Sequence, residues 1–253
     1  MTNVLDKGYV NLVESWGSDE RIIEAARMST NKGFQGWGPQ HEVLCRDYGK
    51  SPKELWNDGS FCNCQPKPGD EKLLTYLWAN NHHTPFEMAG ATFEIYAPIF
   101  VIREWHRHRT FSYNEMSGRY VELPNDYYLP TIDRIKAGRQ SLKNKQGSEE
   151  GFTDHDAHLL WEQMQDVVLD SRRAYEKLLA QGVSREVARM VLPVSQYSRF
   201  RASGNLRNWL HFLRLRLDQG AQWEIRQYAN AVGGALMEMF PRTYELFARE
   251  LPR

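Results

Sequence analysis

The sequence predicts an α+β fold in which an antiparallel or mixed sheet packs against a helical C-terminal half. Segments with strand-like composition come first, segments with helical spacing of apolar residues dominate the second half, and the two kinds do not alternate. The chain has 253 residues, 41% of them hydrophobic, which is enough for one substantial core. We therefore expect a single domain over residues 1–253.

The N-terminal elements are set by alternation, capping and breaker residues. Residues 3–17, "NVLDKGYVNLVESWG", alternate like a strand and end at a glycine. A serine or aspartate cap followed by helical spacing predicts a helix over residues 18–29, "SDERIIEAARMS". A further short helix is expected over residues 71–82, "EKLLTYLWANNH".

The remaining elements follow from composition and period. Residues 86–109 are rich in Phe, Ile, Val and Tyr around Pro98, which predicts two strand segments or one bent strand at a sheet edge. Three helical segments follow, over residues 156–182, 184–193 and 205–240. Strands before helices favour α+β over alternating α/β.

Two polar stretches resemble insertions into this regular chain. Residues 30–70 are rich in Gly, Pro, Asn and Asp, with little apolar periodicity apart from a possible short helix near "SPKELW". Residues 137–156 contain almost no apolar side chains and are expected to form a mobile connector. We therefore treat both as surface segments.

Composition excludes several classes of protein. The 32 basic and 32 acidic side chains cancel, so no global field favours nucleic acid or an anionic membrane surface. The sequence has no run of about 18 apolar residues and no secretory signal pattern, so a cytoplasmic protein without a membrane partner is expected.

The cysteines are few and lie together. Cys45, Cys62 and Cys64 are an odd number in one polar region, which makes a disulfide framework a poor interpretation. With His41 they offer four soft ligands, but the spacing H-x3-C then C-x-C is not a usual zinc pattern. We expect no metal, and a zinc site in this loop is the alternative.

The stretch "RHRTFSYNEMSGRY", residues 107–120, is unusually polar and follows an apolar run. In extended chain Arg107 and Arg109 project to one face and His108 to the other. Two adjacent guanidiniums repel each other unless an anion lies between them, and arginine binds phosphate or carboxylate in a bidentate manner. This pattern indicates a phosphorylated ligand. A solvated charge cluster at a strand end is the alternative.

The spacing R-H-R, seven residues, then Ser117 resembles the signature of the flavin-dependent thymidylate synthase family, also called the thymidylate synthase complementing protein family. "NEMSGRY" continues the resemblance, which extends in the family's order over nearly the whole chain apart from the two insertions. The further matching blocks are "LDKGYVNLV", "AARMS", "HHTPFEMAGATFEIYAPIFVIREWHRHR", "ARMVLP", "GNLRNWLHFLRLR" and "AQWEIRQYA". Several blocks in order are far more specific than one short motif.

The resemblance implies methylation of dUMP to dTMP, with 5,10-methylenetetrahydrofolate as the carbon donor and NADPH-reduced FAD as the hydride source. It also implies a homotetramer whose active sites are shared between subunits. The implied flavin contacts are Ser29, Thr84, Arg107, His108, Arg109, Glu115, Asn205, Arg207 and His211, with His82 near the folate and flavin. The implied dUMP contacts are Glu104, Arg107, Glu115, Met116, Ser117, Gly118, Arg119, Arg189 and Arg216. The family often has Gln at the position of Glu104 and Asn at that of His211.

The chemistry of the residues agrees with parts of this assignment. Uracil C5 is a poor nucleophile, which an enzyme activates with a thiolate at C6 or by stabilising negative charge on the ring. None of the cysteines has a convincing nucleophile context, so we expect electrostatic activation without a cysteine nucleophile. No glycine-rich dinucleotide fingerprint follows a strand, which argues against a Rossmann mode of binding for FAD or NADPH.

Arg216 is the candidate catalytic residue. It shares a helical side with large apolar residues, where an unpaired guanidinium is costly, so it requires an anionic partner. A negatively charged uracil is one such partner. The structural alternative is Asp218 or Glu224 near a helix C-terminus.

Two further candidates come from neighbouring helical segments. For Arg189, pairing with Glu186 is the structural alternative to a phosphate contact. Arg207 and His211 are four apart and share a helical face that is suited to the flavin's pyrophosphate or adenosine part.

Three functions are consistent with the sequence. The first is the thymidylate synthase. The second retains flavin and folate but adds water instead of hydride, which gives a hydroxymethyl pyrimidine nucleotide. The third is a non-catalytic nucleic-acid binder, against which the neutral charge argues.

Overall fold

The structure is a computed structural model that describes residues 1–37, 69–140, 148–149 and 151–251. The chain divides into two compact units, each described here by itself. Unit 1 comprises Met1–Glu14, Ala91–Gly204 and Asn208–Ala235, and unit 2 comprises Ser15–Gly90, Asn205–Arg207 and Leu236–Arg253. The prediction of one domain is not tested by this division and stays a prediction.

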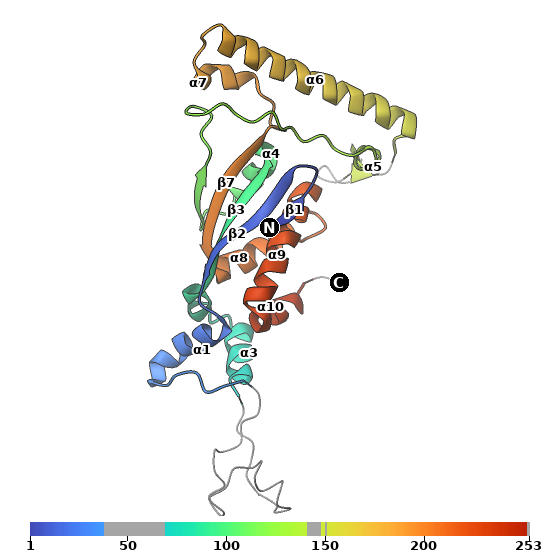
Figure 1. Cartoon of the computed structure of the whole chain (residues 1–253). Coiled ribbons are helices and arrows are strands. Elements are labelled where there is room, and N and C mark those ends of the chain that lie inside the picture. The colour runs from blue at the N-terminus through green and yellow to red at the C-terminus, as the bar shows by residue number, and fades with distance from the viewer. Residues whose placement is uncertain (38–68, 141–147, 150, 252–253) are drawn as a thin grey trace, which may run out of the picture. The chain divides into compact units, whose positions relative to one another are not determined.

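A five-stranded sheet forms the centre of unit 1 (Figure 1). Its order is β1-β2-β3-β7-β4. The β1–β2 and β4–β7 pairs are antiparallel, with Asn3 opposite Tyr9 and Tyr113 opposite Ala202. The strands are β1 (Thr2–Val4), β2 (Gly8–Trp16), β3 (Gly90–Pro98), β4 (Ser112–Glu115) and β7 (Tyr197–Asn205). The predicted α+β class is therefore confirmed.

The expected first strand is a hairpin, because the chain reverses between β1 and β2. Leu5 has a φ of 58°, the left-handed conformation that such a tight reversal uses. Gly8 then begins β2 where there is no room for a side chain. A Cβ at Gly8 would lie 2.1 Å from the Tyr228 hydroxyl and 2.7 Å from the carbonyl oxygens of Tyr96 and Val4.

Gly8→Ala is therefore expected to lower the free energy of unfolding by about 2–3 kcal/mol, because backbone oxygens cannot move aside as a flexible side chain does. Gly234→Ala is the matched control, since Gly234 lies in an exposed part of a helix where a Cβ meets nothing within 4 Å. That variant is expected to gain up to about 1 kcal/mol through helix propensity. Urea unfolding measures both, and equal effects would contradict the packing argument.

The prediction for residues 86–109 is correct only for its first part. β3 ends at Pro98, and a helix, α4 (Ile99–Trp105), follows. Proline has no N–H to continue the ladder, and its backbone suits the residue before a helix. The first N–H groups of α4, those of Ile99 and Phe100, donate to the carbonyls of Gln196 and Val194 at 2.9 and 3.0 Å. Burial of one helical face overrides the strand propensity of these residues.

Two helices, α8 (Leu206–Arg216) and α9 (Trp223–Met239), pack against the sheet in unit 1. The Trp209 indole of α8 donates to the Ala91 carbonyl at 3.0 Å, and its ring meets that of Phe93 edge-on. The Tyr228 hydroxyl of α9 donates to the carbonyl of Tyr96 at 2.9 Å. β7 lies directly before α8, and the sequence interpretation missed it as a strand. Its alternating burial is nevertheless the strand period.

The long helix α6 (Asp154–Ala180) contacts α5 (Ile132–Lys136), α7 (Arg185–Ala188) and the 3₁₀ helix η3 (Arg189–Val191). Gly182 ends α6 as predicted, with a φ of 83°. The polar stretch before α6 is not wholly irregular, because β5 (Arg139–Gln140) and β6 (Ser148–Glu149) pair within it. Among the described residues, no helix is long and apolar enough to cross a membrane.

Unit 2 contains α1 (Asp19–Arg27), the 3₁₀ helices η1 (Met28–Thr30) and η2 (Thr84–Met88), α3 (Glu71–Ala79) and α10 (Pro241–Ala248). The predicted helices at α1 and α3 are confirmed, and Ser18 caps α1. The sequence interpretation stopped before α10 and missed it.

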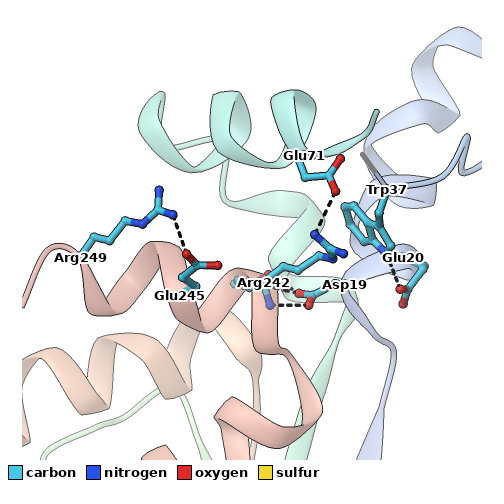
Figure 2. Close-up of polar contacts among 8 residues, drawn as sticks. Asp19, Glu20, Trp37, Glu71, Arg242, Glu245 and Arg249 are labelled. Atoms are coloured by element: carbon cyan, nitrogen blue, oxygen red, sulfur yellow. Dashed lines mark hydrogen bonds and ion pairs between the residues drawn. The ribbon is translucent and has the colours of Figure 1, made fainter. Parts of the chain in front are cut away.

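Polar contacts, some of them buried, join the helices of unit 2 (Figure 2). Asp19 accepts hydrogen bonds from the backbone N–H groups of Arg242 and Thr243 and from the Thr243 hydroxyl, and so satisfies the first turn of α10. Arg242 reaches Glu71 at 2.9 Å and lies over the Trp37 ring. Charged side chains at these helix ends therefore position α1, α3 and α10.

Candidate active site

The R-H-R motif lies in a turn directly after α4 rather than at a strand end. His108 is buried, whereas Arg107 and Arg109 are exposed. The predicted extended geometry after a strand is therefore wrong, and what separates His108 from the two arginines is its burial in the turn. The single proton of the Tyr113 hydroxyl is shared between the Trp105 carbonyl at 2.7 Å and the His108 carbonyl at 3.0 Å, and this contact fixes the turn.

Arg216, at the end of α8, meets this turn within unit 1. Its Nη1 donates to Oε2 of Glu104 at 2.7 Å and its Nη2 donates to the Glu104 carbonyl at 2.9 Å. Its Nε donates to Nε2 of His108 at 3.0 Å. The Arg216 side chain is 15% exposed. The candidate catalytic arginine and two motif-region residues thus form one cluster from α4, the turn and α8.

Asp218 and Glu224, the alternative partners considered for Arg216, bind other groups in the structure. Glu224 accepts from Arg134 Nε at 2.9 Å and from the Tyr128 hydroxyl at 3.3 Å. Asp218 accepts from the backbone N–H of Gly220 at 2.7 Å. The anionic partner of Arg216 within the described chain is Glu104, where the family often has an uncharged Gln.

Burial, together with the Arg216 guanidinium and the nearby His211 ring, lowers the pKa of His108 to about 4. The imidazole packs against Phe212 with ring centroids 5.0 Å apart, and His211 lies at 6.2 Å. Water is excluded from the ring, and a neighbouring positive charge opposes a second one. His108 is therefore neutral near pH 7.

This pKa predicts a loss of stability in acid. Between the ordinary histidine pKa of 6.5 and a folded value of about 4, the unfolded chain binds a proton that the folded chain does not. The free energy of unfolding therefore falls as pH falls through this window, by up to about 3 kcal/mol from His108. Urea unfolding of wild type and His108→Gln at pH 7 and pH 4.5 measures the effect. Wild type is expected to lose more stability than the variant, and parallel losses would contradict the assignment.

A second cluster joins the loop after β4 to η3. A Cβ at Gly118 would lie 3.3 Å from Cδ of Arg189 and 3.1 Å from Cδ1 of Leu123, so the loop packs closely against both side chains. Glu186, proposed as the structural partner of Arg189, instead lies 3.3 Å from Nε of Arg119. Two of the segments assigned to dUMP are thus brought into contact, and the Glu186 carboxylate pairs with Arg119 rather than with Arg189.

Unit 2 contains a cavity of about 770 Å³. Three residues assigned to the flavin or folate line it, namely His82, Thr84 and Arg207. The rest of the wall mixes apolar side chains with polar ones: Ala25, Ala26, Met28, Leu77, Asn81, His83, Pro85, Glu87 and Met88. Volume and lining are typical of a small-molecule or cofactor site.

The C-terminus of α3 positions His82 in this wall. Asn81 adopts a φ of 56°, its N–H donates to the Trp78 carbonyl, and the His82 N–H donates to the Leu77 carbonyl at 2.9 Å. This is a Schellman motif with Asn in the place usually taken by Gly. The sequence "ANNHHTP" therefore ends one helix and turns the chain directly into η2.

Glu87 is a site residue that the sequence interpretation missed. Its Oε1 accepts from Nη1 of Arg207 at 2.5 Å, which holds that guanidinium in the cavity wall. A recognisable signal exists, since Glu87 is the acidic side chain in the matched block "HHTPFEMAG".

The other predicted contacts are placed individually. Ser29 lies exposed in η1, with its hydroxyl donating to the Ala26 carbonyl at 3.1 Å. Asn205 ends β7 in unit 2, whereas His211 is exposed on α8 in unit 1. Glu115 pairs with Phe200 across β4–β7, and the Met116 N–H donates to the Arg199 carbonyl at 2.8 Å.

The predicted flavin contacts are therefore divided between the two units. Those in unit 1 are Arg107, His108, Arg109, Glu115 and His211, and those in unit 2 are Ser29, His82, Thr84, Asn205 and Arg207. The possible metal ligands His41, Cys45, Cys62 and Cys64 lie outside the described residues.

Comparisons with known proteins show the family to which this chain belongs. A family profile described as "Thymidylate synthase complementing protein" matches residues 11–242. A flavin-dependent thymidylate synthase of Thermus thermophilus is 40% identical over 248 residues, covering 98% of this chain and 78% of the relative. One from Thermotoga neapolitana is 38% identical over 246 residues, covering 97% and 93% of the two chains.

The chain is also similar in fold to solved structures of a nucleotide methylase. A UMP/dUMP methylase, PolB, from Streptomyces cacaoi bound with 5-Br dUMP has a TM-score of 0.74 and 30% identity, covering 97% of this chain and 96% of that one. The same enzyme bound with 5-Br UMP has a TM-score of 0.75 and 29% identity, covering 98% and 96% of the two chains.

Proposed function

Because this chain belongs to the thymidylate synthase complementing protein family, we propose that it methylates dUMP to dTMP, with 5,10-methylenetetrahydrofolate as carbon donor. The observation that carries the proposal is the largely buried guanidinium of Arg216, fixed by Glu104 and His108 beside the R-H-R turn. The relatives' names support the reaction, since they are thymidylate synthases and a UMP/dUMP methylase.

Arg216 acts on the pyrimidine ring. A uracil that carries negative charge on its ring oxygens is a stronger nucleophile at C5, and a positioned guanidinium in a water-poor site stabilises that charge. Arg189 and the backbone around Gly118 bind the phosphate, since arginine and backbone N–H groups are its usual donors. Each of these residues belongs to unit 1.

The cavity of unit 2 fits part of a flavin. Arg207 offers a guanidinium to phosphate, and apolar side chains such as Leu77 and Met88 offer surface to an aromatic ring. FAD reduced by NADPH would supply the hydride that completes the methyl group. His82 and Thr84 would orient the ring through their polar atoms.

We propose that four copies of the chain form the enzyme, with active sites shared between them. Residues that flank Arg189 support this, because Val187, Met190 and Val194 are large apolar side chains exposed in the single chain, Met190 at 78%. Light scattering is expected to give a mass four times the 29.6 kDa of the chain, and a monomer would contradict the proposal.

A product assay tests the function. Purified protein with FAD, NADPH, methylenetetrahydrofolate and dUMP is expected to yield dTMP by mass spectrometry, and omission of NADPH is expected to abolish it. A parallel reaction with UMP measures whether the ribonucleotide is also methylated. A hydroxymethyl product would replace the proposed reaction with hydration, and no product despite bound flavin would refute it.

Substituting serine for Cys45, Cys62 and Cys64 together is expected to leave dTMP synthesis within about twofold of wild type, because ring activation by Arg216 requires no thiolate. The steady-state rate at saturating dUMP measures this. Circular dichroism confirms that the variant is folded. Loss of activity in a folded variant would instead support a thiol mechanism.

A further inference from the structure

The hydrogen bond between Arg216 and His108 has only one possible direction. A guanidinium carries donors alone, so the 3.0 Å contact between Nε of Arg216 and Nε2 of His108 requires a lone pair on the imidazole nitrogen. The proton of the ring therefore lies on Nδ1. An imidazolium has no acceptor to offer and would face the arginine with a like charge.

The surroundings hold His108 in this form. The side chain is 6% exposed, and its ring lies edge-on to those of Phe111 and Phe212. The charged and titratable groups that face it are Arg216 and His211 of α8; Arg107 and Arg109 are adjacent in the chain, and Glu104 of α4 binds the far side of Arg216. Arg216 contributes the charge in direct contact, and that charge disfavours protonation.

The three anchors of Arg216 together define the plane of its guanidinium. Glu104 holds one N–H of each terminal nitrogen, and His108 holds the N–H of Nε. Without the Nε anchor, the group remains attached to Glu104 but can swing about that contact. Three of the five N–H bonds are engaged with described residues, which leaves two for a ligand.

We propose that His108 is a positioning residue that fixes the Arg216 guanidinium, together with Glu104, so that its two remaining N–H groups meet the pyrimidine. The inference rests on the proposed function for the role of Arg216, but the placement of the arginine by His108 stands on geometry alone. The histidine of the R-H-R motif acts through the arginine and not on the substrate. A guanidinium that is already held in position binds the transition state more strongly, although His108 itself makes no contact with the substrate.

Two variants separate positioning from packing. His108→Phe keeps a planar ring against Phe111 and Phe212 but removes the acceptor, whereas His108→Gln places an amide oxygen near the position of Nε2. We expect His108→Phe to lower kcat for dTMP formation about 100-fold, as loss of an aligned donor does, and His108→Gln to stay within about 10-fold of wild type. Flavin content, read from absorbance, normalises each rate because His108 is also a predicted flavin contact.

Crystal structures of the two flavin-loaded variants supply a readout independent of turnover. Arg216 is expected to leave its wild-type position in His108→Phe and to keep it in His108→Gln. An unmoved Arg216 in His108→Phe, or equal loss of activity in both folded variants, would overturn the positioning role. If wild type makes no dTMP, the proposed function fails, and the arginine's position in the variants still decides the structural inference.

Discussion

Arg216→Ala is expected to lower kcat/KM for dUMP methylation about 1000-fold or more, the upper range for removing one buried donor that stabilises developing negative charge. The bonds to Glu104 and His108 preset the guanidinium before substrate arrives, and alanine removes the charge as well as both remaining donors. Steady-state kinetics with dUMP measure the effect. The absorbance of bound flavin is expected to remain largely intact, because Arg216 is not itself among the predicted flavin contacts.

Arg214→Ala is the matched control for that experiment. Arg214 is an exposed arginine on the same helix, and two residues before Arg216 it projects to the opposite side. Its replacement removes the same charge from α8 without touching the cluster. Comparable losses from the two variants, or retained turnover in Arg216→Ala, would remove Arg216 from the chemistry.

Asp70→Ala is expected to destabilise the protein by about 3–5 kcal/mol, the usual cost of removing one partner of a buried ion pair. Asp70 is fully buried before α3 and accepts from Nε of Arg27 at 3.0 Å, as well as from Nη2 of the same arginine. Its second oxygen accepts from the Gln35 N–H at 2.6 Å. Alanine leaves the largely buried guanidinium of Arg27 without its carboxylate.

The midpoint of urea unfolding measures this loss, with Glu245→Ala as control. Glu245 pairs with Arg249 on the surface of α10, as Figure 2 shows, and both side chains are exposed. Surface pairs of this kind contribute little, so the control midpoint is expected to stay unchanged. A small shift of the unfolding midpoint for Asp70→Ala would contradict the prediction and would mean that the Arg27 guanidinium binds another group or becomes hydrated.

Local signals in the sequence predicted the elements that carry them. Ser18 before α1 and Gly182 after α6 marked helix ends correctly, because capping depends on residues a few positions apart. The errors arose where tertiary contacts decide the structure. Residues 99–105 have strand-like composition but form α4, because Pro98 ends the ladder and carbonyls preceding β7 accept the first N–H groups. No local pattern encodes those distant partners.

In the candidate site, too, the sequence identified residues by type but not the contacts between distant residues. The R-H-R motif, Ser117 and Arg216 were identified from the sequence, since their residue types match a family pattern and a plausible anion chemistry. The contact of Arg216 with Glu104 and His108 joins positions more than 100 apart, which spacing alone cannot reveal. Glu87 lies in a matched block of the sequence, but its partner Arg207 is 120 positions away and is identified only in the fold.

The backbone bond from the Asp70 N–H to the Gly36 carbonyl, 2.9 Å long, has an evolutionary consequence. This bond joins Gly36 to Asp70, the two residues that flank segment 37–69. The Asp70 carboxylate strengthens the connection by accepting a hydrogen bond from the Gln35 N–H. Once such ends are held, doubling the length of chain between them costs only about 0.6 kcal/mol of closure entropy. We therefore expect relatives to differ in the number of residues at this place while α1 and α3 stay undisturbed, and a domain grafted there to be tolerated for the same reason.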